Sequence, residues 1–304
     1  MKLSVEELKK KYKFRDRVVR VISVDGKFRC SLIVNSTATK TAQAKHELSI
    51  VPAFFQSRAM SAASLLASFL KGEERIILET NSNGVISKVY AEASQNGEIR
   101  SYVDYDHKRI ETEINRLEDA LGLGLLNVSR ILFNNTEPIS GVVPLQRGDI
   151  ATDLAYYFIQ SEQIPTSVIL DVDFDDDGTV KSSGGLLVQA MPGATDSDLQ
   201  KIVDSMTEME KLSQYIEREM LVPEIMKEVL PFEFNILSSV PVDFFCRCSK
   251  EQFVTRIMTL GLDEVKSMKV EGHNEAVCRY CNNKYYLTDK DFEGMIQDLR
   301  AKRN

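Results

Sequence analysis

Short runs rich in β-branched and alternating apolar residues, separated by turn residues, recur through the first two thirds of the chain. A period of two is typical of β-strands, because successive side chains point to opposite faces of a sheet. The first two runs flank Asp25-Gly26, a turn sequence that predicts a β-hairpin. We expect strands over residues 18–24, 27–34, 74–80, 85–91, 99–103, 168–174 and 180–189.

Helical patterns lie among these strands. Residues 57–71 are rich in Ala, Leu, Met and Ser with apolar residues on most sides, which predicts a helix that packs against a sheet and ends at Gly72. Residues 150–163 also have a helical pattern, and Ser4 with Glu7 forms a capping box that predicts a short N-terminal helix. This mixture predicts an α+β fold with an N-terminal core of sheet and helix.

The pattern changes after Gly193. Apolar residues, three of them Met, recur mostly three or four apart over residues 195–220, which predicts one amphipathic helix. Residues 221–242 contain three prolines and several apolar residues, which favours an extended connector rather than part of a core. The predicted organisation is an N-terminal domain of residues 1–193, a helical linker of residues 194–240 and a C-terminal domain of residues 241–304.

Composition and charge exclude several function classes. With 304 residues, of which 43% are hydrophobic, the chain is long enough for two units with real cores. No apolar run approaches the roughly 20 residues of a membrane helix, and the N-terminus lacks a signal-peptide pattern, so we expect a cytoplasmic protein. The net charge of −7 disfavours nucleic-acid binding, since affinity for phosphates comes mainly from Lys and Arg.

Four of the five cysteines form two close pairs near the C-terminus. Cys246 and Cys248 enclose one residue, Cys278 and Cys281 enclose two, and 29 residues separate the pairs. A reducing cytosol makes structural disulfides rare, so clustered cysteines indicate a metal or redox site. Two pairs of thiolates can surround one tetrahedral zinc ion. We therefore predict a Zn²⁺ site with these four cysteines as ligands.

The residues around the pairs predict a small zinc module. Strand-like residues on both sides of the second pair favour a zinc knuckle, and a capping box at Ser249 opens a helix that ends at Gly261. A final helix follows Thr288. A module of roughly 60 residues with so small a core needs its metal to fold, because zinc binding contributes about 10 kcal/mol in such units.

The role of the zinc stays open on the spacing alone. A Cys-X-Cys pair is unusual among structural fingers. Arg247, Arg279, Lys250 and Lys284 add positive charge that favours thiolates, and hence both zinc binding and oxidation. The same cations also suit an inert cluster, as its counter-ions. A redox-responsive site and a structural zinc are the two interpretations.

Other candidate sites are assigned to structural roles. His273 is a rival ligand, but four sulfurs already complete a zinc shell, so we expect it in an exposed loop. Cys30 lies in a predicted strand without a neighbouring cysteine, so we expect a buried thiol. Residues 173–178 copy the first half of a calcium-binding loop, but Gly184 replaces its closing glutamate, so we expect a hairpin turn. Catalytic motifs are missing from the sequence, and we do not expect an enzyme.

The cysteine pairs, their spacing and residues 278–282 resemble the redox-regulated 33-kilodalton chaperonin family of heat-shock proteins. The resemblance covers nearly the whole chain, and the cysteine spacing is its most specific part. Residues 34–38 and 45–48 look less like the family, which leaves client preference and dimer contacts open. Stretches similar to the family's N-terminal landmarks are residues 25–29, 70–72, 97–103, 140–144, 161–167 and 191–193.

The resemblance implies a cytoplasmic molecular chaperone of the holdase type rather than an enzyme. It implies that the reduced, zinc-bound form is inactive, and that oxidation forms the disulfides Cys246–Cys248 and Cys278–Cys281 and releases the zinc. The preceding linker then unfolds, and the protein binds unfolding client proteins and prevents their aggregation. A homodimer in the active state, and transfer of clients to ATP-driven foldases, are implied as well.

Two other functions compete on the residues alone. A zinc ribbon that binds nucleic acid or a protein partner is disfavoured by the charge of residues 241–304, where 11 Lys and Arg against 10 Asp and Glu give +1. A thiol oxidoreductase normally places its Cys-X-X-Cys motif at the start of a helix after a strand. Here that motif lies in a predicted knuckle.

Overall fold

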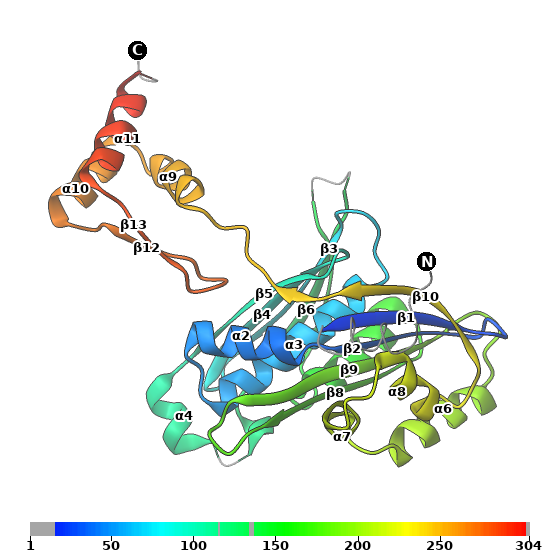
Figure 1. Cartoon of the computed structure of the whole chain (residues 1–304). Coiled ribbons are helices and arrows are strands. Elements are labelled where there is room, and N and C mark those ends of the chain that lie inside the picture. The colour runs from blue at the N-terminus through cyan, green and yellow to red at the C-terminus, as the bar shows by residue number, and fades with distance from the viewer. Residues whose placement is uncertain (1–15, 115, 134–136, 302–304) are drawn as a thin grey trace. The chain divides into compact units, whose positions relative to one another are not determined.

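The computed structural model describes residues 16–114, 116–133 and 137–301 (Figure 1). The predicted N-terminal helix lies outside the described residues. The chain divides into two compact units, Met1–Phe245 and Cys246–Asn304. The segment 194–240, which we expect to be a linker, therefore belongs to the first unit in this structure. Over the described residues, no helix has the length and apolar character needed to cross a membrane.

The first sheet of the larger unit has five antiparallel strands in the order β10-β1-β2-β9-β8. The predicted hairpin is confirmed: β1 pairs with β2 so that Val18 lies opposite Ile33, and Gly26 in the turn has a φ of 73°. That left-handed conformation is the reason glycine suits this position. The strands are β1 (Arg17–Ser23), β2 (Phe28–Val34), β8 (Thr166–Phe174), β9 (Val180–Ala190) and β10 (Phe234–Pro241).

The second sheet has six strands in the order β11-β5-β4-β3-β6-β7. Its neighbours are antiparallel except for β11, which pairs in parallel with β5 at the sheet edge. Strands β6, β7 and β11 were not predicted from the sequence; β7 contains Gly141, and β11 has only two residues. The strands are β3 (Arg75–Ser82), β4 (Ile86–Ser94), β5 (Glu98–Tyr105), β6 (Gly124–Ile131), β7 (Ile139–Pro144) and β11 (Asp243–Phe244).

Helix α3 (Ile50–Ala67) lies between the two sheets and contacts strands of both (Figure 1). Fourteen of its residues are buried, most of them Ala, Ser or Leu, which explains why apolar residues occur on most of its sides. The helix was predicted over residues 57–71 but begins earlier and ends at Ala67. Pro52 stands in its first turn, where a missing backbone N–H costs nothing, so that proline does not delay the start.

Helix α2 (Ser36–His46) precedes α3 and was not predicted. Its buried residues are Ala38, Thr39, Ala42 and Gln43, so its core-facing side has little apolar signal. The remaining helices of this region are α4 (His107–Glu113), the short 3₁₀ segment η1 (Leu117–Asp119), α5 (Ile150–Tyr157) and the π-turn η2 (Phe158–Glu162). The last two confirm the helix predicted over residues 150–163.

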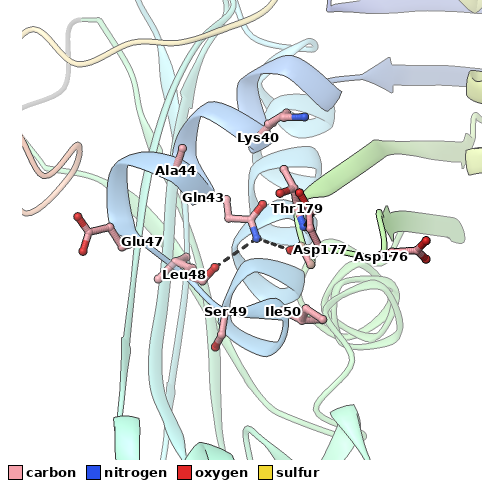
Figure 2. A pocket seen from close by; sticks show the side chains of 11 residues that line it. Lys40, Gln43, Ala44, Glu47, Leu48, Ser49, Ile50, Asp176, Asp177 and Thr179 are labelled. Carbon is pink, nitrogen blue, oxygen red and sulfur yellow. Dashed lines mark hydrogen bonds between the residues drawn. The ribbon is translucent and has the colours of Figure 1, made fainter.

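A hollow of about 540 Å³ lies at the corner between α2 and α3, where the β8–β9 turn meets them (Figure 2). Gln43 joins these parts: its amide nitrogen donates to the carbonyl oxygens of Leu48 at 3.2 Å and Gly178 at 2.8 Å, and its amide oxygen accepts from the Val180 N–H at 2.8 Å. The turn between two paired strands confirms the hairpin expected for residues 173–178.

Three helices cover the face of the first sheet opposite α3: α6 (Asp196–Glu208), α7 (Leu212–Glu217) and α8 (Val222–Val229). The single helix predicted over residues 195–220 is wrong, because the chain breaks between α6 and α7. The expectation that residues 221–242 form an extended connector outside a core is also wrong for their first part. Ile225 and Met226 of α8 are fully buried with Val21 and Leu32 of the sheet.

The smaller unit contains a two-stranded hairpin and three helices. Its core consists of Val265, Leu287, Phe292 and Met295 with partly buried neighbours. The predicted knuckle and the first and last helices are confirmed, whereas the middle helix was missed. The elements are α9 (Lys250–Met258), α10 (Leu262–Glu271), β12 (Glu275–Val277), β13 (Lys284–Tyr286) and α11 (Asp289–Ala301).

Candidate metal centre

The turn between β12 and β13 presents Cys278 and Cys281 on one side of the knuckle. The Cys278 N–H donates to the Asn283 carbonyl at 2.9 Å, and the N–H groups of Cys281 and Asn282 donate to the Cys278 carbonyl at 3.3 and 2.7 Å. Asn282 has a φ of 57°, a left-handed conformation that Asn tolerates better than most residues. These backbone bonds fix the spacing of two ligands before any ion binds.

The other half of the centre, Cys246 and Cys248, lies in the extended residues just before α9. Ser249 is the N-cap of that helix, and its hydroxyl accepts from the Gln252 N–H at 3.3 Å. A capped helix start thus follows Cys248 directly, which limits the freedom of this half as well.

All four sulfur atoms lie within 4.8 Å of one another. Two of these distances join the two halves: Cys246 Sγ to Cys278 Sγ is 3.7 Å and Cys248 Sγ to Cys281 Sγ is 3.3 Å. Sulfurs placed tetrahedrally at about 2.3 Å from a zinc ion would stand roughly 3.8 Å apart. All four are free thiols in this structure. The donor set therefore fits a tetrahedral metal with soft ligands.

The two pairs differ in exposure, and Cys246, Cys248 and Cys281 differ in acidity. Cys278 and Cys281 are buried, whereas Cys246 and Cys248 are partly exposed. Burial raises the pKa of Cys246 and of Cys281, and neighbouring thiolates add repulsion. Burial also opposes ionisation of Cys248, but hydrogen bonds from Tyr285 and from other thiols outweigh it and lower the pKa of Cys248. A divalent cation would relieve this repulsion.

Tyr285 of β13 reaches the centre and was not identified from the sequence. Its hydroxyl oxygen lies 3.1 Å from Cys248 Sγ and 2.9 Å from the Cys248 carbonyl oxygen. The ring packs against Phe253 of α9 with centroids 5.3 Å apart. The hydrogen bond with Cys248 raises the pKa of Tyr285 to about 12. Tyrosine four residues after the last cysteine carried no distinctive spacing, so only the fold reveals it.

The lysines near the cysteines have carboxylate partners. Lys250 pairs with Asp291 at 2.6 Å, and Lys284 pairs with Glu275 at 3.3 Å. Their charges are therefore shared with acids, which weakens their expected role in favouring thiolates.

Two other candidates take the positions expected of them. The side chain of His273 is 65% exposed, lies outside the cysteine cluster and pairs with Glu271 at 3.4 Å. Cys30 is fully buried within β2, and burial raises the pKa of its thiol. Such a thiol is protonated and shielded, and therefore unreactive.

Comparisons with known proteins agree on one family. The family model described as Hsp33 protein matches residues 16–288. The 33 kDa chaperonins of Staphylococcus aureus strains JH9 and Newman are each 31% identical over 290 residues, covering 93% of this chain and 99% of theirs. The crystal structure of the 33 kDa chaperonin, a heat shock protein 33 homolog, from Thermotoga maritima superposes with a TM-score of 0.84 at 27% identity, covering 93% of this chain and 98% of that one.

Proposed function

Since this chain belongs to the Hsp33 family, it is a chaperone, and we propose that oxidation of its four clustered cysteines switches that activity on. The reduced protein holds Zn²⁺ and is inactive. The oxidised protein binds unfolding clients and prevents their aggregation. The observation that carries the proposal is the gathering of four free thiols within 4.8 Å, from two segments far apart in the chain.

Cys246, Cys248, Cys278 and Cys281 are the zinc ligands in this proposal. Bound zinc would supply positive charge that keeps the four sulfurs as thiolates. Hydrogen peroxide is the oxidant: for each disulfide, two thiolate sulfurs lose two electrons, one S–S bond forms, the O–O bond breaks, and two waters leave after taking two protons from solvent. The disulfides are Cys246–Cys248 and Cys278–Cys281. Sulfurs joined in a disulfide no longer bind the ion, which departs.

The small core of the C-terminal unit links this chemistry to binding. In the described part of the unit, the core cluster contains four buried apolar side chains, which is few for a unit of this size, so loss of the metal unfolds the unit. Residues 234–245, which directly precede Cys246, form the edge strands β10 and β11 of the two sheets. An edge strand is held on one side only. Release of residues 234–245 together with α6 to α8 exposes apolar surface, to which unfolded proteins can bind.

We also infer where the protein works and how it assembles. The protein works in the cytoplasm, where reduced thiols are the resting state. It is a homodimer when active, and it catalyses no reaction. These statements follow the family and the absence of a catalytic motif in the sequence.

Metal and thiol analysis tests the switch. Reduced protein is expected to hold one zinc per chain, and peroxide with mild heating is expected to release it while the chain loses four hydrogens by mass. Replacement of Cys278 and Cys281 by Ser is the matched control, and we expect it to remove tight zinc binding. Full retention of zinc by fully oxidised protein would contradict the proposal.

A further inference from the structure

A tyrosine hydroxyl, in addition to the sulfur atoms, connects the two halves of the metal centre. Tyr285 belongs to the knuckle, whereas Cys248 belongs to the extended segment before α9. The Tyr285 hydroxyl lies 3.1 Å from Cys248 Sγ and 2.9 Å from the carbonyl oxygen of the same residue. Two groups of a single ligand from the other half thus lie within hydrogen-bond distance of this hydroxyl.

Rigid elements fix the position of that hydroxyl. The backbone of Tyr285 pairs with Ala276 in the β12–β13 hairpin, next to the turn that carries Cys278 and Cys281. Its ring packs against Phe253, which stands on the first turns of α9, five residues after Cys248. A side chain held at its backbone and along its ring loses little entropy when its hydroxyl forms a hydrogen bond.

We propose that Tyr285 is a positioning residue of the metal centre, whose hydroxyl hydrogen is shared between the Cys248 carbonyl oxygen and the Cys248 thiolate and holds the Cys246–Cys248 half against the knuckle. A thiolate only accepts hydrogen bonds, and a bond to a charged acceptor is stronger than a neutral one. This inference rests on the proposed zinc site, and it adds a residue that tunes how firmly that site stays closed.

The hydrogen bond has two chemical consequences. It orients a ligand, and partners of this kind typically contribute 10–100-fold to metal affinity. It also draws electron density from sulfur, so that Cys248 attacks an oxidant more slowly. Tyr285 therefore keeps the reduced form metal-bound and slows the opening of the switch.

Zinc release from reduced full-length protein tests the first consequence, with a chromogenic chelator as the probe. Tyr285→Phe keeps the ring contact with Phe253 and loses only the hydroxyl. We expect it to release zinc about tenfold faster than the unmodified protein. Tyr286→Phe is the matched control, because Tyr286 is the next residue in the chain and is 58% exposed. This variant should release zinc at the rate of the unmodified protein. Equal release by the two variants would overturn the inference.

Cobalt(II) substitution tests the bond to sulfur itself, which a merely structural tyrosine would not affect. Loss of a hydrogen bond makes the thiolate a better electron donor, so the sulfur-to-cobalt charge-transfer band of Tyr285→Phe should move to longer wavelength. An unchanged band would overturn the inference. Both measurements use reduced protein without oxidant or client, so their outcome is separate from whether oxidation activates the chaperone.

Discussion

The sulfur atoms of Cys246 and Cys278 lie 3.7 Å apart although 32 positions separate them in the chain. The fold of this small unit brings them together, and over residues 246–301 its core cluster has four buried apolar side chains. The metal centre and the stability of this unit are therefore expected to depend on each other.

Chelation of zinc from the reduced protein is expected to unfold the C-terminal unit alone. Hydrogen exchange should show loss of protection in β12, β13 and α9 to α11, while β1, β2 and β9 of the larger core keep theirs, because that core contains no part of the metal centre. Unchanged protection of the knuckle after complete removal of the metal would contradict the account.

Cys30 serves as an internal control for the other cysteines. Cys30→Ala removes a fully buried sulfur from the core and should reduce the free energy of unfolding by about 1 kcal/mol through the small cavity it leaves. Zinc content and peroxide response should not change, because its shielded thiol takes no part in the switch. Urea unfolding and metal analysis check both statements, and loss of zinc from this variant would place Cys30 in the switch.

Gly97 stands where residues 234–245 pass from one sheet to the other. A Cβ on Gly97 would meet the Pro241 carbonyl oxygen at 1.8 Å, and its φ of 91° disfavours side chains. Gly97→Ala should therefore loosen the β10–β11 junction, at a cost of about 1–3 kcal/mol. If release of residues 234–245 activates the chaperone, Gly97→Ala will need less peroxide than the unmodified protein for half-maximal protection of a client.

The matched control is Gly294→Ala, since Gly294 lies within α11 and a Cβ there meets nothing within 4 Å. Alanine is favoured over glycine in a helix, so this change should stabilise the zinc-bound unit slightly. An identical peroxide requirement in the two variants would argue against the junction as part of the switch.

Asp16 gives the larger unit a distinctive pH dependence. Its carboxylate accepts a hydrogen bond from the Ala38 N–H at 2.7 Å near the start of α2, yet burial raises the pKa of Asp16 from 3.8 to about 6. Between these pH values the folded state binds the proton more readily than the unfolded state. The stability that this group contributes is thus present below pH 4 and lost as pH rises through 6, by roughly 3 kcal/mol.

Asp16→Asn tests this statement, because the amide cannot ionise. The difference in urea stability between Asp16→Asn and the unmodified protein should shift in favour of the variant by that amount between pH 4 and pH 7. A difference that stays constant with pH would show that Asp16 has an ordinary pKa.

Much of the fold follows from local signals in the sequence. Asp25-Gly26 predicts the first hairpin because few sequences suit so tight a turn, and the spacing of Cys246, Cys248, Cys278 and Cys281 predicts the cluster because their chemistry allows few other uses. These features depend on residues close in sequence, or on chemistry that is itself distinctive.

Other features depend on tertiary contacts that leave little trace in the sequence. Helix α2 buries Thr39 and Gln43, so its pattern looks polar. Pro223 suggested an extended connector, but it occupies the first turn of α8, where proline is favoured. Tyr285 became visible only when the fold placed its hydroxyl beside Cys248.

Light scattering of a heat-unfolding client protein tests the central claim most directly, with this protein added either reduced and zinc-loaded or after peroxide with mild heating. We predict that only the oxidised protein suppresses aggregation, and that reduction with zinc restores the inactive form. Equal suppression by both forms would contradict a redox switch and leave a constitutive chaperone with a structural zinc site.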